Sequence, residues 1–162
     1  MPRTYLLSVV AVILCLAVLA GEQAAPPTTL STALRAHVKD ERFGIVTSVR
    51  GLPLGVREAM QTLFGSGLLD IAEPGAEFQA TDLMVNPKLP SRRLVIAGCS
   101  ADHCLVYYER GGIARTWRVT LFHWTPPETR LELGGGAAGG LATIGDVRNA
   151  ILSGEIKSQT SW

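Results

Sequence analysis

Side chains that could do chemistry are concentrated at residues 99–104, which read Cys99-Ser100-Ala101-Asp102-His103-Cys104. Short apolar runs at 92–98 and 105–109 flank this segment, so the pattern predicts two strands joined at a hairpin tip. The tip would carry two thiols, an imidazole and a carboxylate. These groups suit a disulfide, a metal site, redox chemistry or a nucleophile.

The metal, redox and nucleophile interpretations each lack a required element. Zinc could recruit Cys99, Cys104, His103 and His123, but no second Cys/His pair follows, and adjacent His103 and Cys104 would ligate awkwardly. Redox catalysis uses a Cys-x-x-Cys pair at a helix start, whereas this pair is wider and lies between strands. A Cys–His nucleophile needs a free thiol, and the second cysteine argues against one. The sequence therefore predicts no metal, no cofactor and no enzyme.

The first twenty residues have the pattern of a secretory signal. Arg3 precedes the uncharged run 5–19, and Val18-Leu19-Ala20 offers the small residues that signal peptidase needs. The run is too short for a good membrane span, although an uncleaved anchor is the alternative. Leu14 before Cys15 is too large for lipoprotein processing. We expect a periplasmic or secreted protein that leaves the membrane after cleavage.

Cleavage after Ala20 removes Cys15 and leaves Cys99 and Cys104 in an oxidising compartment, where a disulfide is the expected state. So small a ring gains less entropic stability than a long one would, but it makes the tip rigid. Rigid loops lose less freedom on binding. We therefore predict that the inner residues contact a partner, namely Ser100, Ala101, Asp102 and His103. The alternative is a bridge that only secures the hairpin.

Length and net charge limit the number of domains and the kinds of partner that the chain can have. The sequence has 162 residues, with 15 basic and 14 acidic side chains and a formal net charge of +1. This balance gives no electrostatic footprint for nucleic acid or an anionic membrane surface. Residues 21–28 are expected to form a flexible leader, and 29–162 to form one domain.

Three helices are predicted from apolar periodicity. The first covers 30–40, with Thr28 or Thr29 as its N-cap and His37 at the edge of its apolar face. The second begins at Pro53 and ends at Gly65. The third begins at residue 143 or 146 and stops before residue 154.

The strand signals fall mostly between the second and third helices. A glycine-rich run at 134–140 is expected to be a connector, because it lacks the Lys-Ser/Thr of a phosphate-binding loop. Helices first, strands next and a helix last predict an α+β fold, with an antiparallel sheet of four to five strands, flanking helices and a disulfide-closed tip. The predicted strands are 43–49, 78–85, 92–98, 105–109, 113–124 and 130–133.

No pair of acidic residues has the pattern of a glycosidase site. Asp70, Glu73 and Glu77 lie around Pro74-Gly75, and we interpret them as a solvated loop.

The arrangement of segments resembles the family of periplasmic inhibitors of vertebrate lysozyme. In that family the loop reads Cys-Lys-Pro-His-Asp-Cys, and the matching positions here are Cys99 to Cys104. Residues 146–155 also look like the family's last helix and the Ser/Thr-Gly after it. The layout corresponds over residues 30–158. Ser100 and Ala101 replace the Lys and Pro, and Asp102-His103 reverses the order of His and Asp.

The resemblance implies a stoichiometric inhibitor whose disulfide-closed loop enters the cleft of a lysozyme or another glycosidase. An imidazole on such a loop can hydrogen-bond the two carboxylates that flank the scissile bond. The resemblance also implies a homodimer. The alternative is a non-inhibitory periplasmic protein of the same fold, with a structural disulfide and a ligand elsewhere, near Trp117 and Trp124.

Overall fold

The computed structural model describes residues 29–83, 86–126, 128–157 and 162. The predicted signal segment, 1–20, and the leader, 21–28, lie outside the described residues. Within the described ranges, no helix has the length and apolar character needed to cross a membrane.

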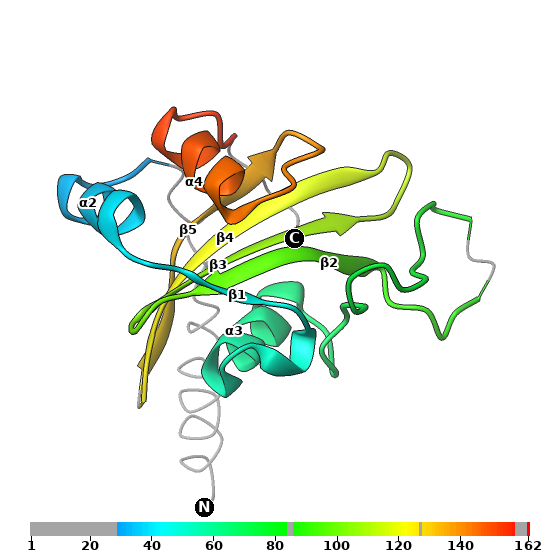
Figure 1. The fold of residues 1–162 in the computed structure, drawn as a ribbon. Helices are drawn as coiled ribbons and strands as arrows, with labels where there is room; N and C mark the ends of the chain where they lie inside the picture. The colour runs from blue at the N-terminus through cyan, green and yellow to red at the C-terminus, as the bar shows by residue number, and fades with distance from the viewer. Residues whose placement is uncertain (1–28, 84–85, 127, 158–161) are drawn as a thin grey trace, which may run out of the picture.

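A five-stranded antiparallel sheet forms the centre of the structure, with the order β1-β2-β3-β4-β5 (Figure 1). Strands β2 to β5 follow one another as a meander, so each pairs with its neighbour in the chain. The fold is thus α+β, as predicted. The strand bounds are β1 Gly44–Val46, β2 Arg92–Cys99, β3 His103–Arg110, β4 Thr116–Thr125 and β5 Glu128–Ala137.

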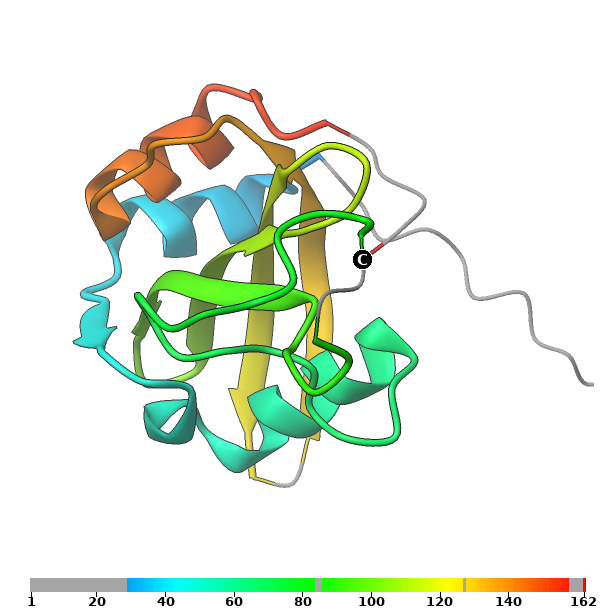
Figure 2. The same ribbon diagram turned by 90° about the vertical axis from the view of Figure 1, so that its right-hand side faces the viewer.

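Within the described part of the chain, three α-helices cover the two faces of the sheet. Helices α2 (Thr32–Asp40) and α4 (Ile144–Leu152) lie together on one face, and α3 (Leu54–Phe64) lies on the other (Figures 1 and 2). A short 3-10 helix, η2 (Val49–Gly51), precedes α3. Helix α3 ends where Gly65 adopts a left-handed conformation with a φ of 62°.

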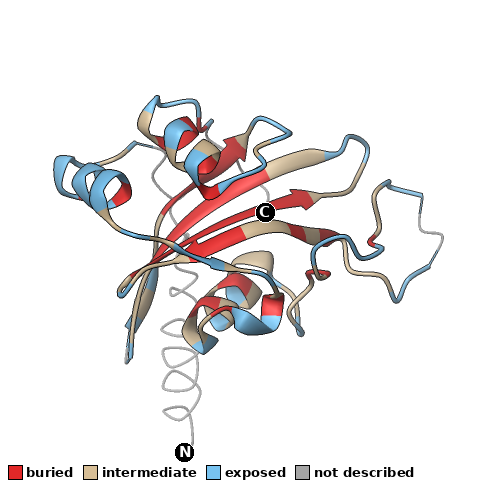
Figure 3. Ribbon diagram, in the orientation of Figure 1, coloured by how far each residue is buried: buried red, intermediate tan, exposed pale blue. Residues whose placement is uncertain are grey.

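Both faces of the central strands are buried, as Figure 3 shows. On β3, Leu105 and Tyr107 point to the core under α2 and α4, whereas Val106 and Tyr108 point to the core over α3. Successive side chains of a strand alternate between faces, and both faces here carry helices. This explains why β3 reads as a nearly unbroken apolar run.

The caps of α2 and α4 settle where these helices begin. Ser31 caps α2 by accepting a hydrogen bond from the Leu34 N–H at 3.1 Å, so the predicted Thr28 or Thr29 cap is wrong. Helix α4 begins with a reciprocal capping box between Thr143 and Asp146, so both predicted start residues take part.

The segment predicted as a strand at 78–85 does not form one over its described residues. Phe78 is buried, but the guanidinium groups of Arg93 and Arg115 lie over its ring, 4.6 and 5.6 Å from the ring centroid. An isolated bridge from Thr81 to Gly112 is the only backbone pairing of the described residues of this stretch with the β2–β3 hairpin or the turn after it. An apolar anchor inside a long loop has a local pattern similar to that of a short strand. The predicted strand 43–49 is also shorter, because η2 begins at Val49.

The glycine run at 134–140 is not a connector over its first part, because residues 134–137 belong to β5. A Cβ at Gly134 would lie 2.6 Å from the Trp162 ring, and a Cβ at Gly135 would lie 2.4 Å from the Lys157 carbonyl oxygen. Lys157 of the C-terminal segment pairs antiparallel with Gly136 of β5 and bonds it through both of its backbone groups. Glycine is needed here for close approach of two backbones.

Candidate functional site

The disulfide-closed turn lies at the end of the β2–β3 hairpin. Cys99 and Cys104 are direct partners in the strand register and are joined by a disulfide, as predicted. Inside the ring, the Ser100 N–H donates to the His103 carbonyl at 2.7 Å, and the His103 N–H donates to the Ser100 hydroxyl oxygen at 3.0 Å. The turn therefore has a fixed conformation of its own.

The four predicted contact residues differ sharply in exposure. Ala101 is exposed, Ser100 is half-buried and the Asp102 side chain is 39% exposed. His103 is only 3% exposed. In this structure the imidazole faces the protein, so the solvent-facing atoms of the turn come mainly from Ala101 and Asp102.

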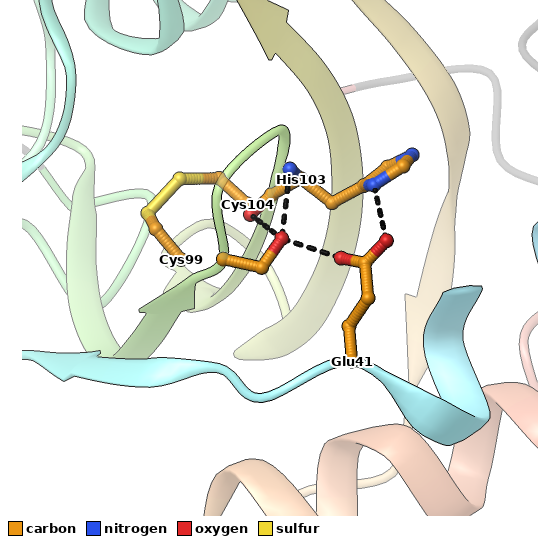
Figure 4. Close-up of a disulfide and its surroundings, with 5 residues drawn as sticks. Glu41, Cys99, His103 and Cys104 are labelled. Carbon is orange, nitrogen blue, oxygen red and sulfur yellow. Dashed lines mark hydrogen bonds and ion pairs between the residues drawn. A yellow bond between two sulfur atoms is a disulfide. The ribbon is translucent and has the colours of Figure 1, made fainter.

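The end of helix α2 covers the His103 ring. Glu41, the C-cap residue of α2, places Oε1 3.1 Å from His103 Nδ1, while its Oε2 accepts a hydrogen bond from the Ser100 hydroxyl (Figure 4). One carboxylate thus binds both the ring and the turn. Helix α2 is held in place by Arg148 of α4, whose guanidinium donates to the carbonyls of Val38 and Lys39.

All three histidines of the sequence lie together at this end of the sheet. The ring centroids of His37 and His103 are 4.7 Å apart, and those of His103 and His123 are 5.3 Å apart. His37 Nδ1 is 2.5 Å from Glu41 Oε1. We call this cluster the histidine end; it consists of His37, Glu41, Asp102, His103, His123 and Glu132.

Sequence reasoning placed His37 on a helix edge, apart from the turn. It joined His123 to His103 only in the cysteine-containing zinc set, which it rejected. Two signals could have suggested the cluster. His37 and Glu41 are four residues apart, which places them on the same side of a helix turn. His103 and His123 are cross-strand partners in the β3–β4 register. The contact between α2 and the turn has no local signal, because 62 residues separate Glu41 from His103.

A β-bulge brings Glu132 to the same cluster. Leu121 pairs with Leu133 and Phe122 pairs with Leu131, so Glu132 is the extra residue of β5. Its Oε2 lies 3.7 Å from His103 Nε2, and its Oε1 accepts from Arg130 at 2.7 Å. Each nitrogen of the His103 ring therefore faces a carboxylate.

The electrostatics of Asp102 follow from its histidine neighbours. Desolvation acts to raise the pKa of this carboxyl, but the hydrogen bond with His103 and the electrostatic interaction with the three histidines together outweigh it. The pKa of Asp102 is consequently lowered, and the group is ionised at neutral pH.

The order of groups around Glu41 differs from that of a serine hydrolase. In a Ser–His–Asp triad the imidazole lies between the hydroxyl and the carboxylate, so that it can take the hydroxyl proton. Here the carboxylate of Glu41 lies between the Ser100 hydroxyl and the His103 ring. His103 is not placed to activate Ser100 as a nucleophile.

The acidic loop around Pro74 is structural, and the interpretation of Asp70 and Glu73 as solvated is wrong. Asp70 accepts from the Ser91 N–H at 2.8 Å and pairs with the Arg92 guanidinium. Glu73 accepts from the Val49 N–H at 2.6 Å. Both carboxylates are used to hold neighbouring segments in place.

The opposite end of the sheet carries cations. A hollow of about 480 Å³ lies there beside Trp117, with Arg115, Arg118 and Lys157 among the residues that line it. Glu155 is the acidic side chain in this lining. We call the group of charged residues at this end of the sheet the arginine end; it consists of Asp70, Arg92, Arg93, Glu109, Arg115 and Arg118.

Comparison of the chain with protein-family models, curated proteins and solved structures gave no match.

Proposed function

We propose that the chain is an exported, non-enzymatic binding protein of the lysozyme-inhibitor type, whose disulfide-closed turn at 99–104 contacts the cleft of a lysozyme or another glycosidase. One observation carries the proposal. The disulfide, the hydrogen bonds between Ser100 and His103, and the brace from Glu41 all fix the same turn. A turn ordered in advance loses little conformational entropy when a partner binds.

Ala101 and Asp102 form the contact, because they supply the exposed part of the turn. His103 supports the turn from within, since its ring is buried against Glu41. The ionised carboxylate of Asp102 would seek N–H donors or basic groups at the rim of a cleft. In the resembled family an imidazole contacts the two catalytic carboxylates. The negative charge of Asp102 would instead be repelled by them.

The position of Ser100 favours binding over turnover. Its hydroxyl proton is directed to Glu41, and the imidazole lies beyond that carboxylate. Stoichiometric occupation of a cleft needs no such proton transfer.

The test is a titration of the purified, oxidised protein into chicken-type lysozyme, followed by the lysis of a bacterial cell-wall suspension. We expect inhibition that saturates at a fixed molar ratio. Ala101→Arg places a long cation on the exposed tip, where the fold has room for it. This variant should inhibit at least about tenfold less well, as expected for the loss of about 1.4 kcal/mol of binding free energy.

Ile113→Arg is the matched control. Ile113 is 94% exposed in the turn at the other end of strand β3, so the same side chain is introduced far from the proposed contact. It should inhibit as the unmodified protein does. Absence of inhibition by the unmodified protein at large excess, or equal loss in both variants, contradicts the proposal.

The hollow beside Trp117 favours a second candidate, a non-inhibitory protein of the same fold with a purely structural disulfide. Its lining joins an indole to the cations Arg115 and Lys157, which suits a small anionic ligand. This candidate takes precedence if the unmodified protein and the Ala101→Arg variant both leave lysis unchanged.

A further inference from the structure

Three potential metal ligands converge at the histidine end from two distant segments. The ligand atoms of His37, Glu41 and His103 all lie within 4.8 Å of one another. Glu41 Oε1 is the common neighbour, at 2.5 Å from His37 Nδ1 and 3.1 Å from His103 Nδ1. Figure 4 shows Glu41 directed from the end of α2 toward the His103 ring. A cation bound by these atoms would replace the direct contacts between them, because ligand atoms about 2.0 to 2.2 Å from Zn²⁺ lie roughly 3.3 to 3.5 Å from one another.

The donor set selects the class of cation. Two imidazole nitrogens and one carboxylate oxygen are typical ligands of Zn²⁺ and related borderline metals, whereas Ca²⁺ and Mg²⁺ prefer oxygen alone. Cys99 and Cys104 offer no thiolate, because they are joined to each other. The set is therefore different from the cysteine-containing one considered from the sequence.

The surroundings of His103 are those of a metal-ligating histidine. Its Nδ1 faces the other ligands, while its Nε2 faces Glu132 at 3.7 Å. A carboxylate that accepts a hydrogen bond from the second ring nitrogen fixes the tautomer and makes the first nitrogen a better ligand. Glu132 would take this part once zinc has displaced the proton that Nδ1 shares with Glu41 and Asp102, and once the 3.7 Å gap at Nε2 has closed to hydrogen-bond distance. The β5 bulge and the bond from Arg130 hold that carboxylate in place.

Two further groups border the same space. Asp102 Oδ1 lies 3.0 Å from His103 Nδ1, so a second carboxylate flanks the position that the cation would take. The Nδ1 atom of His123 is buried and has no hydrogen-bond partner among the described residues, and its ring is 5.3 Å from that of His103. Neighbours of this kind add negative charge and a further nitrogen close to the site.

The cluster is also open to solvent on one side. The side chains of His37 and Asp102 are 46% and 39% exposed, whereas His103 is 4% exposed. A cation can therefore enter past His37 and reach the buried imidazole without unfolding the turn.

We propose that His37, Glu41 and His103 bind one Zn²⁺ ion, with Glu132 as the positioning residue for His103. The ion would link helix α2 to strand β3, two segments that only the fold brings together. The zinc site shares Glu41 and His103 with the brace of the turn, but its argument does not rest on the proposed contact with a glycosidase.

The first measurement is calorimetric titration of zinc chloride into tag-free, chelator-treated, oxidised protein, with Co²⁺ absorbance as a second readout. We expect one ion per chain and visible Co²⁺ bands. His37→Gln should weaken zinc binding by more than about 100-fold, beyond the range seen when only a supporting group is lost. His37 is exposed, so this variant should keep its fold.

Ala36→Gln is the matched control, because it introduces the same side chain at an adjacent exposed position of α2 and should bind zinc normally. Glu132→Gln should weaken binding by about 10- to 100-fold while the position of the Co²⁺ bands is unchanged, since the ligands themselves remain. Absence of zinc binding, or equal affinities for the unmodified protein and His37→Gln, would overturn the proposal.

Discussion

The two ends of the sheet bury ionisable groups against different partners. At the arginine end, Arg92 pairs with Asp70 and its guanidinium lies 4.1 Å from the centre of the Phe64 ring. Arg93 pairs with the buried carboxylate of Glu109 in the same way. At the histidine end, carboxylates surround imidazoles rather than guanidiniums.

This difference separates a structural region from one that can bind ligands. Arginine stays charged at all accessible pH values, so each buried guanidinium needs a permanent partner. A neutral imidazole has a lone pair and can give it to a cation or a proton. We therefore expect substitutions at the arginine end to reduce stability, and substitutions at the histidine end to act more on binding and local order.

The largest effect is expected at the arginine end. Asp70→Asn leaves the guanidinium of Arg92, which is 5% exposed, without its anionic partner. The free energy of unfolding should fall by about 2 to 3 kcal/mol, which is less than the roughly 3 to 5 kcal/mol for a fully buried ion pair because the Asp70 side chain is 27% exposed. Urea denaturation measures this. Asp82→Asn, in an exposed loop, is the control and should stay within about 0.5 kcal/mol of the unmodified protein. Equal losses of unfolding free energy in the two variants would mean that the Asp70–Arg92 pair does not stabilise the fold.

A smaller effect is expected from the disulfide at the histidine end. Replacing both Cys99 and Cys104 with Ala opens a ring of six residues, for which loop entropy predicts a loss of about 2 kcal/mol.

Hydrogen exchange shows whether the disorder produced by this double replacement stays local. The amides of Ser100 and Trp124 form hydrogen bonds within and beside the turn, and their hydrogen-exchange rates should rise. The amides of Leu94 and Gly111, at the arginine end, should change only with global stability. Uniform acceleration at both ends would mean that the bridge supports the whole sheet.

The smallest effect concerns the acid stability of α4, whose first residue, Ile144, packs against Gly98 beside the disulfide. Hydrogen bonds from Thr143, and then from the Ala142 N–H, lower the pKa of Asp146. A carboxyl with a lowered pKa stabilises the fold above its unfolded pKa of about 4, and this contribution is lost as the pH falls through the folded pKa. Asp146→Asn should therefore lose less stability than the unmodified protein on acidification below about pH 4.

Unfolding curves recorded at a series of pH values measure this difference. Thr143→Ala removes the partner of the same capping box and should show a similar reduction in acid sensitivity. An unchanged pH dependence in both variants would place the acid-labile groups elsewhere in the protein.

Local patterns predicted most of the fold. The apolar periodicity of α3, its end at Gly65, and the strands on either side of the cysteine pair are all present in the structure. The patterns failed where a distant segment decided the outcome. Gly134 and Gly135 are in a strand because they pair with β4, and the nearby C-terminal segment leaves no room for a side chain there. Phe78 lies in a loop and packs under the guanidinium groups of Arg93 and Arg115.

The candidate site was predicted only in part, for the same reason. The spacing of Cys99 and Cys104 was sufficient to predict the disulfide and the turn. The exposure of His103 was not predictable, because it depends on Glu41, which reaches the ring from the end of another element.

By itself, the sequence determined the α+β pattern and the closed turn, since both rest on residues close together in the chain. Only the tertiary structure decided that the turn is braced by α2, that His103 is buried and that three histidines meet at one end of the sheet. The physical reason is that periodicity and spacing report which face a residue occupies. Which residue of a distant segment packs on that face depends on helix placement, strand register and a bulge.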